Sequence, residues 1–116
     1  MREIDDRIFH LHAEVCKSMA NATRLKILAA LQGGEKAVDE LAGALKVPKA
    51  NLSQHLAILR HRRIVATRRE GLNVFYRCAN PKMLKACELL RQVLMEQLAE
   101  GHELIKAAQV TRHSSH

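Results

Sequence analysis

The sequence has few aromatic residues and no long apolar run. Of its 116 residues only Phe9, Phe75 and Tyr76 are aromatic, so any core must be built from aliphatic side chains. No run of about 18 apolar residues occurs, which argues against a membrane-spanning helix. The N-terminus, MREIDDRIFH, carries charges where a signal peptide would be apolar. We therefore expect a cytoplasmic protein with no membrane partner.

Cysteine is also scarce, and common catalytic motifs are missing. The chain has three cysteines, an odd number that fits no closed disulfide framework. It has no glycine-rich phosphate loop, no nucleophile elbow and no paired carboxylates in an apolar setting. A cysteine–histidine pair that meets only in space is not excluded by these absences. We nevertheless expect that the protein is not an enzyme.

Basic residues, by contrast, are abundant and concentrated in the middle of the chain. The formal net charge is +7 and the pI is about 9.8. Residues 46–85 hold ten Lys and Arg residues and a single acid, Glu70, whereas residues 1–45 hold six basic and seven acidic residues. Basic proteins bind polyanions such as DNA, RNA or acidic membranes. RNA is less favoured, because RNA-binding modules usually stack bases on several aromatic side chains.

Apolar periodicity predicts five helices and a hairpin in a single domain over residues 1–110, followed by a flexible tail at 111–116. The expected helices cover residues 3–20, 22–32, 37–47, 49–61 and 81–107. Asn21 is the expected N-cap of the second helix, with Leu25, Leu28 and Leu31 facing inward. Residues 64–68 and 73–78 are β-prone and flank a turn at Gly71. The fold class is mainly α with a small hairpin, in the order α-α-α-α-β-β-α.

The two end helices are long and amphipathic. One small domain cannot easily cover both apolar faces, and a partner helix usually does so. We therefore expect a homodimer that is held together by the first and last helices.

The third and fourth helices have the spacing of a helix-turn-helix, although an ordinary helical hairpin has the same spacing. The fourth helix favours the first interpretation, because Asn and Gln suit adenine edges and Lys and Arg suit guanine or phosphate. Arg68 and Arg69 flank the hairpin turn, where they can reach phosphates or a minor groove. The candidate DNA-binding residues are Lys49, Asn51, Ser53, Gln54, His55, Arg60, Arg68 and Arg69.

Three stretches, "MANATRLKILAAL", "VDELAGALKVPKANLSQHLAILR" and "IVATRREGLNVFYRCANP", resemble the ArsR/SmtB family of winged-helix repressors. The resemblance covers about residues 13–95. It implies a winged helix-turn-helix, a homodimer, an operator that is an imperfect inverted repeat, and release of the DNA when an effector binds. It places Ser53, Gln54 and His55 against bases and Arg68 and Arg69 on the wing. Pro48 stands where the family often has a capping Ser or Thr.

The usual metal sites of the family have lost their ligands in this sequence. Where the family has a thiolate site, this chain has Ala37 and Asp39. A second site, on the last helix, corresponds to Asn80, Lys82, Val93 and Glu96, of which only Glu96 could bind a metal. Glu100, His102, His113 and His116 reproduce the second site's ligand spacing about twenty residues out of register, and we interpret that match as coincidence.

The three cysteines, Cys16, Cys78 and Cys87, are the remaining candidates for effector sensing. Three thiolates would suit arsenite or another thiophilic ion, and two would suit oxidation by a redox or reactive sulfur signal, with no cofactor. Alternatively, they pack as small hydrophobes, and the protein is an effector-independent DNA-binding regulator. If they do sense, ligation or oxidation of Cys16 and Cys87 would shift the first helix against the last and separate the two recognition helices.

Overall fold

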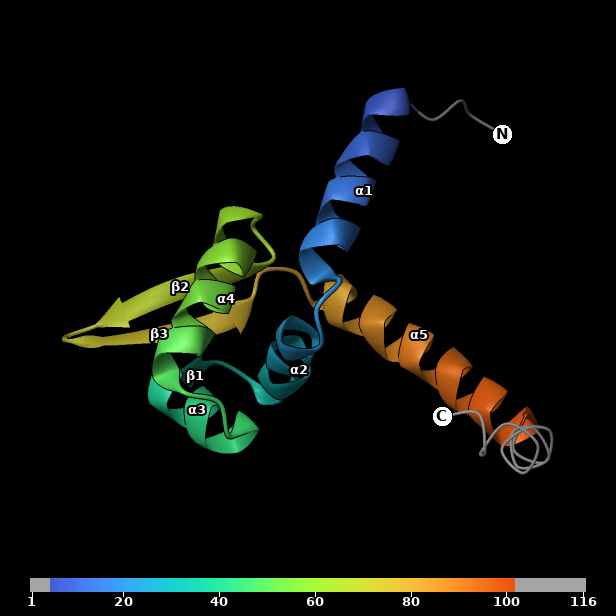
Figure 1. Cartoon of the computed structure of the whole chain (residues 1–116). Coiled ribbons are helices and arrows are strands. Elements are labelled where there is room, and N and C mark those ends of the chain that lie inside the picture. Colours follow the sequence, from blue (N-terminus) through green and yellow to red (C-terminus); the bar gives the residue numbers. More distant parts are fainter. Residues whose placement is uncertain (1–4, 102–116) are drawn as a thin grey trace, which may run out of the picture. The chain divides into compact units, whose positions relative to one another are not determined.

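The computed structural model describes residues 5–101, and the chain divides into two compact units, residues 1–84 and residues 85–116. The first unit contains all elements except most of the last helix (Figure 1). Within residues 5–101 no helix is both long and apolar enough to cross a membrane. The expected domain over 1–110 and the expected tail at 111–116 extend beyond the described residues, so both stay predictions.

Two helices open the first unit. Helix α1 spans Asp6–Met19 and is capped by Asp5, whose carboxylate accepts a hydrogen bond from the Arg7 amide at 2.9 Å. Helix α2 spans Ala22–Ala30, and Asn21 caps it as predicted, since its Oδ1 accepts from the Arg24 amide at 3.1 Å. A 3₁₀ turn, η1, follows over Leu31–Gly33. The second helix thus ends slightly earlier than predicted.

Helices α3 (Val38–Leu45) and α4 (Lys49–His61) form the helix-turn-helix. Lys46 ends α3 in the left-handed conformation, with φ at 56°, and Pro48 then occupies the N-cap of α4 without a capping side chain. At its other end α4 stops at Arg62, and Arg63 has a φ of 59°. This reversal lets the Ile64 amide donate to the Leu59 carbonyl at 2.9 Å and directs the chain into the sheet.

The sheet has three antiparallel strands, whereas the sequence predicted two. Strands β2 (Val65–Glu70) and β3 (Asn73–Cys78) form the predicted hairpin, and Gly71 turns it with a φ of 63°. The missed strand is β1 (Lys36–Ala37), and the strand order is β1-β3-β2. A two-residue strand is too short to show alternation, so no periodicity could have predicted it. Figure 1 shows the hairpin projecting beside α4.

The core of the first unit is aliphatic, as the scarcity of aromatics predicted. Leu25 was predicted to face inward but is 37% exposed; Ile27, two positions on, is buried instead. The buried apolar residues come from α2, η1, α3, α4 and the segment entering β2: Ile27, Leu28, Leu31, Leu41, Leu52, Leu56, Leu59, Ile64 and Val65.

The first and last helices, each taken by itself, carry exposed apolar side chains. On α1, Ile8, Phe9 and Leu11 are each about half exposed or more, and the single buried residue of that helix is Ser18. Helix α5 spans Pro81–Glu100 and buries none of its residues. Its exposed large apolar side chains are Leu89, Leu90, Val93, Leu94, Met95 and Leu98.

Candidate nucleic-acid interface

The predicted reading residues lie on the outer side of α4. Leu52, Leu56 and Leu59 are fully buried and anchor the helix to the core. Because these leucines occupy one side of the helix at three- and four-residue spacing, the side chains between them point away from the core. Five of the six predicted contacts on α4 are exposed, and the sixth, His55, is half-buried: Lys49, Asn51, Ser53, Gln54, Arg60 and His55.

Lys49, at the first turn of α4, is engaged within the protein. Its Nζ lies 2.7 Å from Asp39 Oδ1 on α3. Both side chains are more than half exposed. Exposed ion pairs of this kind contribute about 0–1 kcal/mol, so Lys49 can exchange the carboxylate for a phosphate at small cost. Asp39, which the family resemblance aligned with a metal-site cysteine, is here the ion-pair partner of Lys49.

His55 is also engaged. Its Nδ1 lies 3.2 Å from Nε of Arg24, a residue of α2 that the sequence analysis did not single out. The two residues are 31 positions apart, so no local pattern signals the contact. Arg24 therefore joins the set of residues that shape the outer side of α4.

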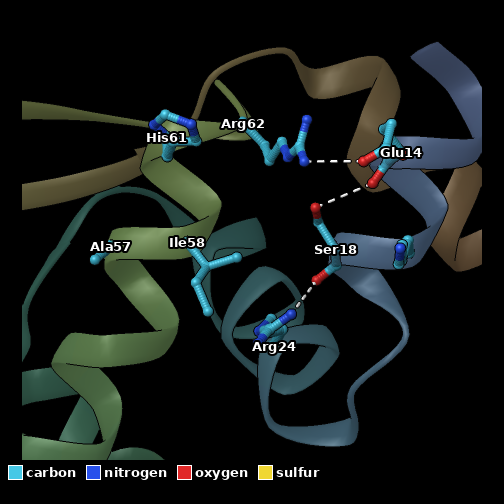
Figure 2. A pocket seen from close by; sticks show the side chains of 8 residues that line it. Glu14, Ser18, Arg24, Ala57, Ile58, His61 and Arg62 are labelled. Atoms are coloured by element: carbon cyan, nitrogen blue, oxygen red, sulfur yellow. Dashed lines mark hydrogen bonds and ion pairs between the residues drawn. The ribbon is translucent and has the colours of Figure 1, made fainter.

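A pocket of about 470 Å³ lies between α1, the start of α2 and the C-terminal half of α4, and Figure 2 shows its lining. Arg62 donates to Glu14 with 2.9 Å between Nη2 and Oε2, which joins the end of α4 to α1. Arg24 donates to the Ser18 carbonyl with 2.8 Å between Nη1 and O, which joins α2 to α1. Ser18 Oγ in turn donates to the Glu14 carbonyl at 3.0 Å. The C-terminal end of α1 is thus tied to α2 and to α4.

The hairpin of β2 and β3 is the wing, and on it Arg68 is bound by two carboxylates of the protein. Its guanidinium donates to both carboxylate oxygens of Glu35, with 3.2 Å from Nε to each oxygen, and to Glu70 Oε2 at 2.6 Å. It also lies over the Phe75 ring, 4.8 Å from the centroid. The hydrogen bonds to Glu35 and Glu70 raise the pKa of Arg68, and the bond from Arg68 lowers the pKa of Glu35 below its ordinary value of 4.5.

Arg69 lies on the other face of the same strand. The register pairs Arg68 with Phe75 and Arg69 with Val74, and successive side chains of a strand point to opposite faces. Arg69 is exposed, and within residues 5–101 its side chain makes no hydrogen bond or ion pair. Of the two predicted wing arginines, Arg69 is the one whose donors are not already used.

None of the three cysteines is in a disulfide. Cys16 is exposed on α1, and Cys87 is half-buried on α5, in the second unit. Cys78 ends β3 opposite Val65, and its Sγ donates to the Asn80 carbonyl at 3.3 Å. Over the part of the chain that the structure describes, no three His, Cys, Asp or Glu side chains cluster in a way that could hold a metal ion.

Asn80, which the family resemblance aligned with the second metal site, has a structural role. Asn80 Oδ1 accepts a hydrogen bond from the Lys82 amide at 3.0 Å, so Asn80 caps α5 directly before Pro81. Glu100 is the last residue of α5. The match to the ligand spacing of the family's second metal site also needed three histidines. These lie outside the described residues: His102, His113 and His116.

Comparison with known proteins identifies the family. The family model for bacterial regulatory proteins of the arsR family matches residues 21–67. The HTH-type transcriptional regulator KmtR of Mycobacterium tuberculosis is 45% identical over 76 residues, which are 66% of this chain and 58% of KmtR. The transcriptional activator HlyU of Vibrio cholerae is 42% identical over 77 residues, 66% of this chain and 71% of HlyU. The chain belongs to the ArsR family.

Solved structures agree in fold. The homodimeric winged helix-turn-helix DNA-binding domain Mb0332 of Mycobacterium bovis matches with a TM-score of 0.75 and 33% identity, over 88% of this chain and 97% of that one. Reduced HlyU of Vibrio cholerae matches with a TM-score of 0.69 and 36% identity, over 76% and 93% of the two chains. The predicted winged helix-turn-helix fold is confirmed. Because these relatives are transcriptional regulators, the prediction that the chain is not an enzyme is confirmed as well.

Proposed function

We propose that this ArsR-family protein is a homodimeric, sequence-specific transcriptional repressor that acts in the cytoplasm on a double-stranded DNA operator. The observation that carries the proposal is the exposed polar side of α4, which is anchored by buried leucines and flanked by a basic wing. An α-helix fits the major groove of B-DNA, where Gln54 and Asn51 suit adenine and Ser53 suits either base type. Arg69 and Arg60 supply charge for phosphates.

The homodimer is supported by the end helices. Leu90, Val93, Leu94 and Leu98 recur at three- and four-residue spacing on α5 and are each at least 45% exposed. Ile8, Phe9 and Leu11 of α1 are similarly open. Covering apolar surface of this extent is the usual reason for a helical homodimer. A two-fold dimer matches an operator with two inverted half-sites about one helical turn apart.

Release of the operator through cysteine chemistry is the finer part of the proposal. Cys16 and Cys87 lie on α1 and α5, the two helices with open apolar faces, and neither is in a disulfide. In a dimer built from these helices, thiols of two protomers can supply ligands for arsenite or another thiophilic ion. Alternatively, an oxidant takes two electrons from two thiols, which lose two protons and form a disulfide. Either event would alter the spacing of the two α4 helices.

The experiment that tests operator binding is selection of duplex DNA from a random pool by the purified protein, followed by binding measurements on the selected sequence. The proposal expects an inverted repeat bound by two protomers. A protein that binds all duplexes equally would contradict sequence-specific recognition.

The sensing step is tested on the protein–operator complex by titration with arsenite, zinc and polysulfide. Cys87→Ser and Cys16→Ser are expected to bind the operator normally and to resist release, whereas Cys78→Ser, the matched control, is expected to respond as the wild type does. If an inducer still releases DNA from both Cys87→Ser and Cys16→Ser, the thiols of Cys87 and Cys16 are structural. A complex that resists every inducer would favour the second candidate, an effector-independent regulator.

A further inference from the structure

Arg24 connects three helices through one side chain. Its backbone amide donates to the N-cap Asn21 at 3.1 Å, which fixes the residue in the first turn of α2. Its guanidinium donates to the Ser18 carbonyl at the end of α1, at 2.8 Å, and to His55 Nδ1 on α4, at 3.2 Å. Arg24 thus lies between the end of α1 and His55, a side chain on the outer side of α4.

The bond to His55 determines which ring nitrogen carries the proton. A guanidinium has five N–H donors and no acceptor, and it stays charged at every physiological pH. The nitrogen that faces it must therefore offer a lone pair, so Nδ1 is unprotonated. A neutral imidazole has one N–H, which then lies on Nε2. Nε2, the ring nitrogen of His55 that does not face Arg24, is therefore a hydrogen-bond donor.

We propose that Arg24 is a positioning residue for sequence recognition, which holds His55 as an Nε2–H donor. This inference rests on the proposed DNA-binding function. In the major groove, a donor pairs with purine N7, guanine O6 or thymine O4, and it is mismatched against the amino groups of adenine and cytosine. His55 would therefore select a base-edge acceptor, although imidazole alone can act in either role.

The second bond of Arg24 explains why arginine serves here. Donation to the Ser18 carbonyl orients the guanidinium plane, and Ser18 is itself the buried residue of α1, at 7% exposure. A lysine at this position would keep the positive charge but lose the fork that serves two acceptors in fixed directions. The Arg24→Lys variant therefore removes the geometry and retains the charge. Arg62→Lys is the matched control, because Arg62 lines the same pocket and bonds to Glu14.

The first test uses the DNA-free protein and so does not depend on the proposed function. Long-range proton–nitrogen NMR at about pH 8, where an ordinary imidazole is neutral, reports which His55 nitrogen is protonated. The expected result is a proton on Nε2 of His55 and an Arg24 Nε–H that exchanges slowly with water. In the His55→Ala variant, which keeps Arg24, the same N–H should exchange faster. A protonated Nδ1, or protection that survives His55→Ala, would overturn the proposal.

The second test uses the selected operator with single base analogues. One set removes an acceptor (purine N7, guanine O6 or thymine O4), and a second set removes a donor amino group (adenine N6 or cytosine N4). Removal of the acceptor at one position should lower the affinity of the wild-type protein roughly 2- to 12-fold, the range for a neutral hydrogen bond. Arg24→Lys and His55→Ala should lose nothing further there, while Arg62→Lys should behave as the wild type does. Sensitivity that maps only to adenine N6 or cytosine N4, or that is independent of His55, would contradict the assignment. Failure to select any operator would instead count against the proposed function.

Discussion

The two faces of the wing hold neighbouring arginines in opposite situations. Arg68 is bound by Glu35 and Glu70 and covers the Phe75 ring, whereas Arg69, one residue later, is exposed and makes no ion pair in the described part of the chain. The strand's alternation alone separates them. A basic side chain on the wing can thus have its counterion inside the protein, as Arg68 does, or have its donors free, as Arg69 does.

Among the wing variants, the largest change in DNA affinity is expected for Arg69→Ala. Arg69→Ala should weaken binding to operator and random DNA alike, by about 10-fold, because it removes one charge-assisted contact to phosphate. The dependence of log K on log salt should become shallower by about 0.9, the amount for one phosphate contact on B-DNA. Fluorescence anisotropy at several salt concentrations measures both. An unchanged slope would place Arg69 away from the DNA.

A smaller, opposite effect is expected for Glu35. Glu35→Gln removes one of the two negative charges that hold Arg68, the one with most of its hydrogen bonds. The guanidinium should then reach a phosphate more easily, so DNA affinity at low salt should rise roughly 3-fold. The same anisotropy series should show a steeper salt dependence than that of the wild type. Glu70→Gln, which leaves Glu35 in place, is the matched control. Weaker binding by Glu35→Gln would show that the ion pair supports the wing's binding geometry.

Arg68→Ala should change DNA affinity by less than about 3-fold, because in the wild type this side chain is occupied by carboxylates at the protein surface. The double variant Arg68→Ala/Glu35→Gln should then lose the gain predicted for Glu35→Gln alone. A loss for Arg68→Ala as large as that for Arg69→Ala would abolish the distinction between the two faces.

The smallest expected effect is the dependence of the wing's stability on pH in the acid range. The hydrogen bond from Arg68 lowers the pKa of Glu35 from its ordinary 4.5, so the charged pair favours the folded wing above that value. This contribution disappears as the pH falls through the lowered pKa and Glu35 takes up a proton. NMR titration of the Glu35 carboxyl should show a midpoint below 4.5 that returns toward 4.5 in Arg68→Ala. An equal midpoint in both proteins would mean that the ion pair does not form in solution.

Much of the fold could be predicted from sequence, because local signals specify it. Asn21 and the Asn80-Pro81 pair mark helix starts, the leucines of α4 repeat at helical spacing, and Gly71 marks the hairpin turn. Strand β1 has no such signal. It forms because β3 offers an edge, with Lys36 opposite Tyr76 and Ala37 opposite Phe75.

The missed strand also explains the missed part of the candidate interface. Because β1 pairs beside Phe75, the preceding Glu35 comes within reach of Arg68, 33 residues away. The Arg24–His55 contact likewise joins α2 to α4 between residues 31 positions apart in the chain. The sequence therefore predicted which polar side chains lie on the outer side of α4 and on the wing, but not which of them have partners inside the protein, since those partners are distant in the chain.

The most direct test of DNA recognition by α4 compares Gln54→Ala with Arg69→Ala on the selected operator and on random duplex DNA. We predict that Gln54→Ala reduces the difference in binding free energy between operator and random DNA by roughly 1–3 kcal/mol, as expected for a side chain that reads a base. The salt slope should not change. Arg69→Ala should lower both affinities and leave their ratio intact. If Gln54→Ala keeps the wild-type ratio, Gln54 does not read the operator and the proposed reading surface of α4 is wrong.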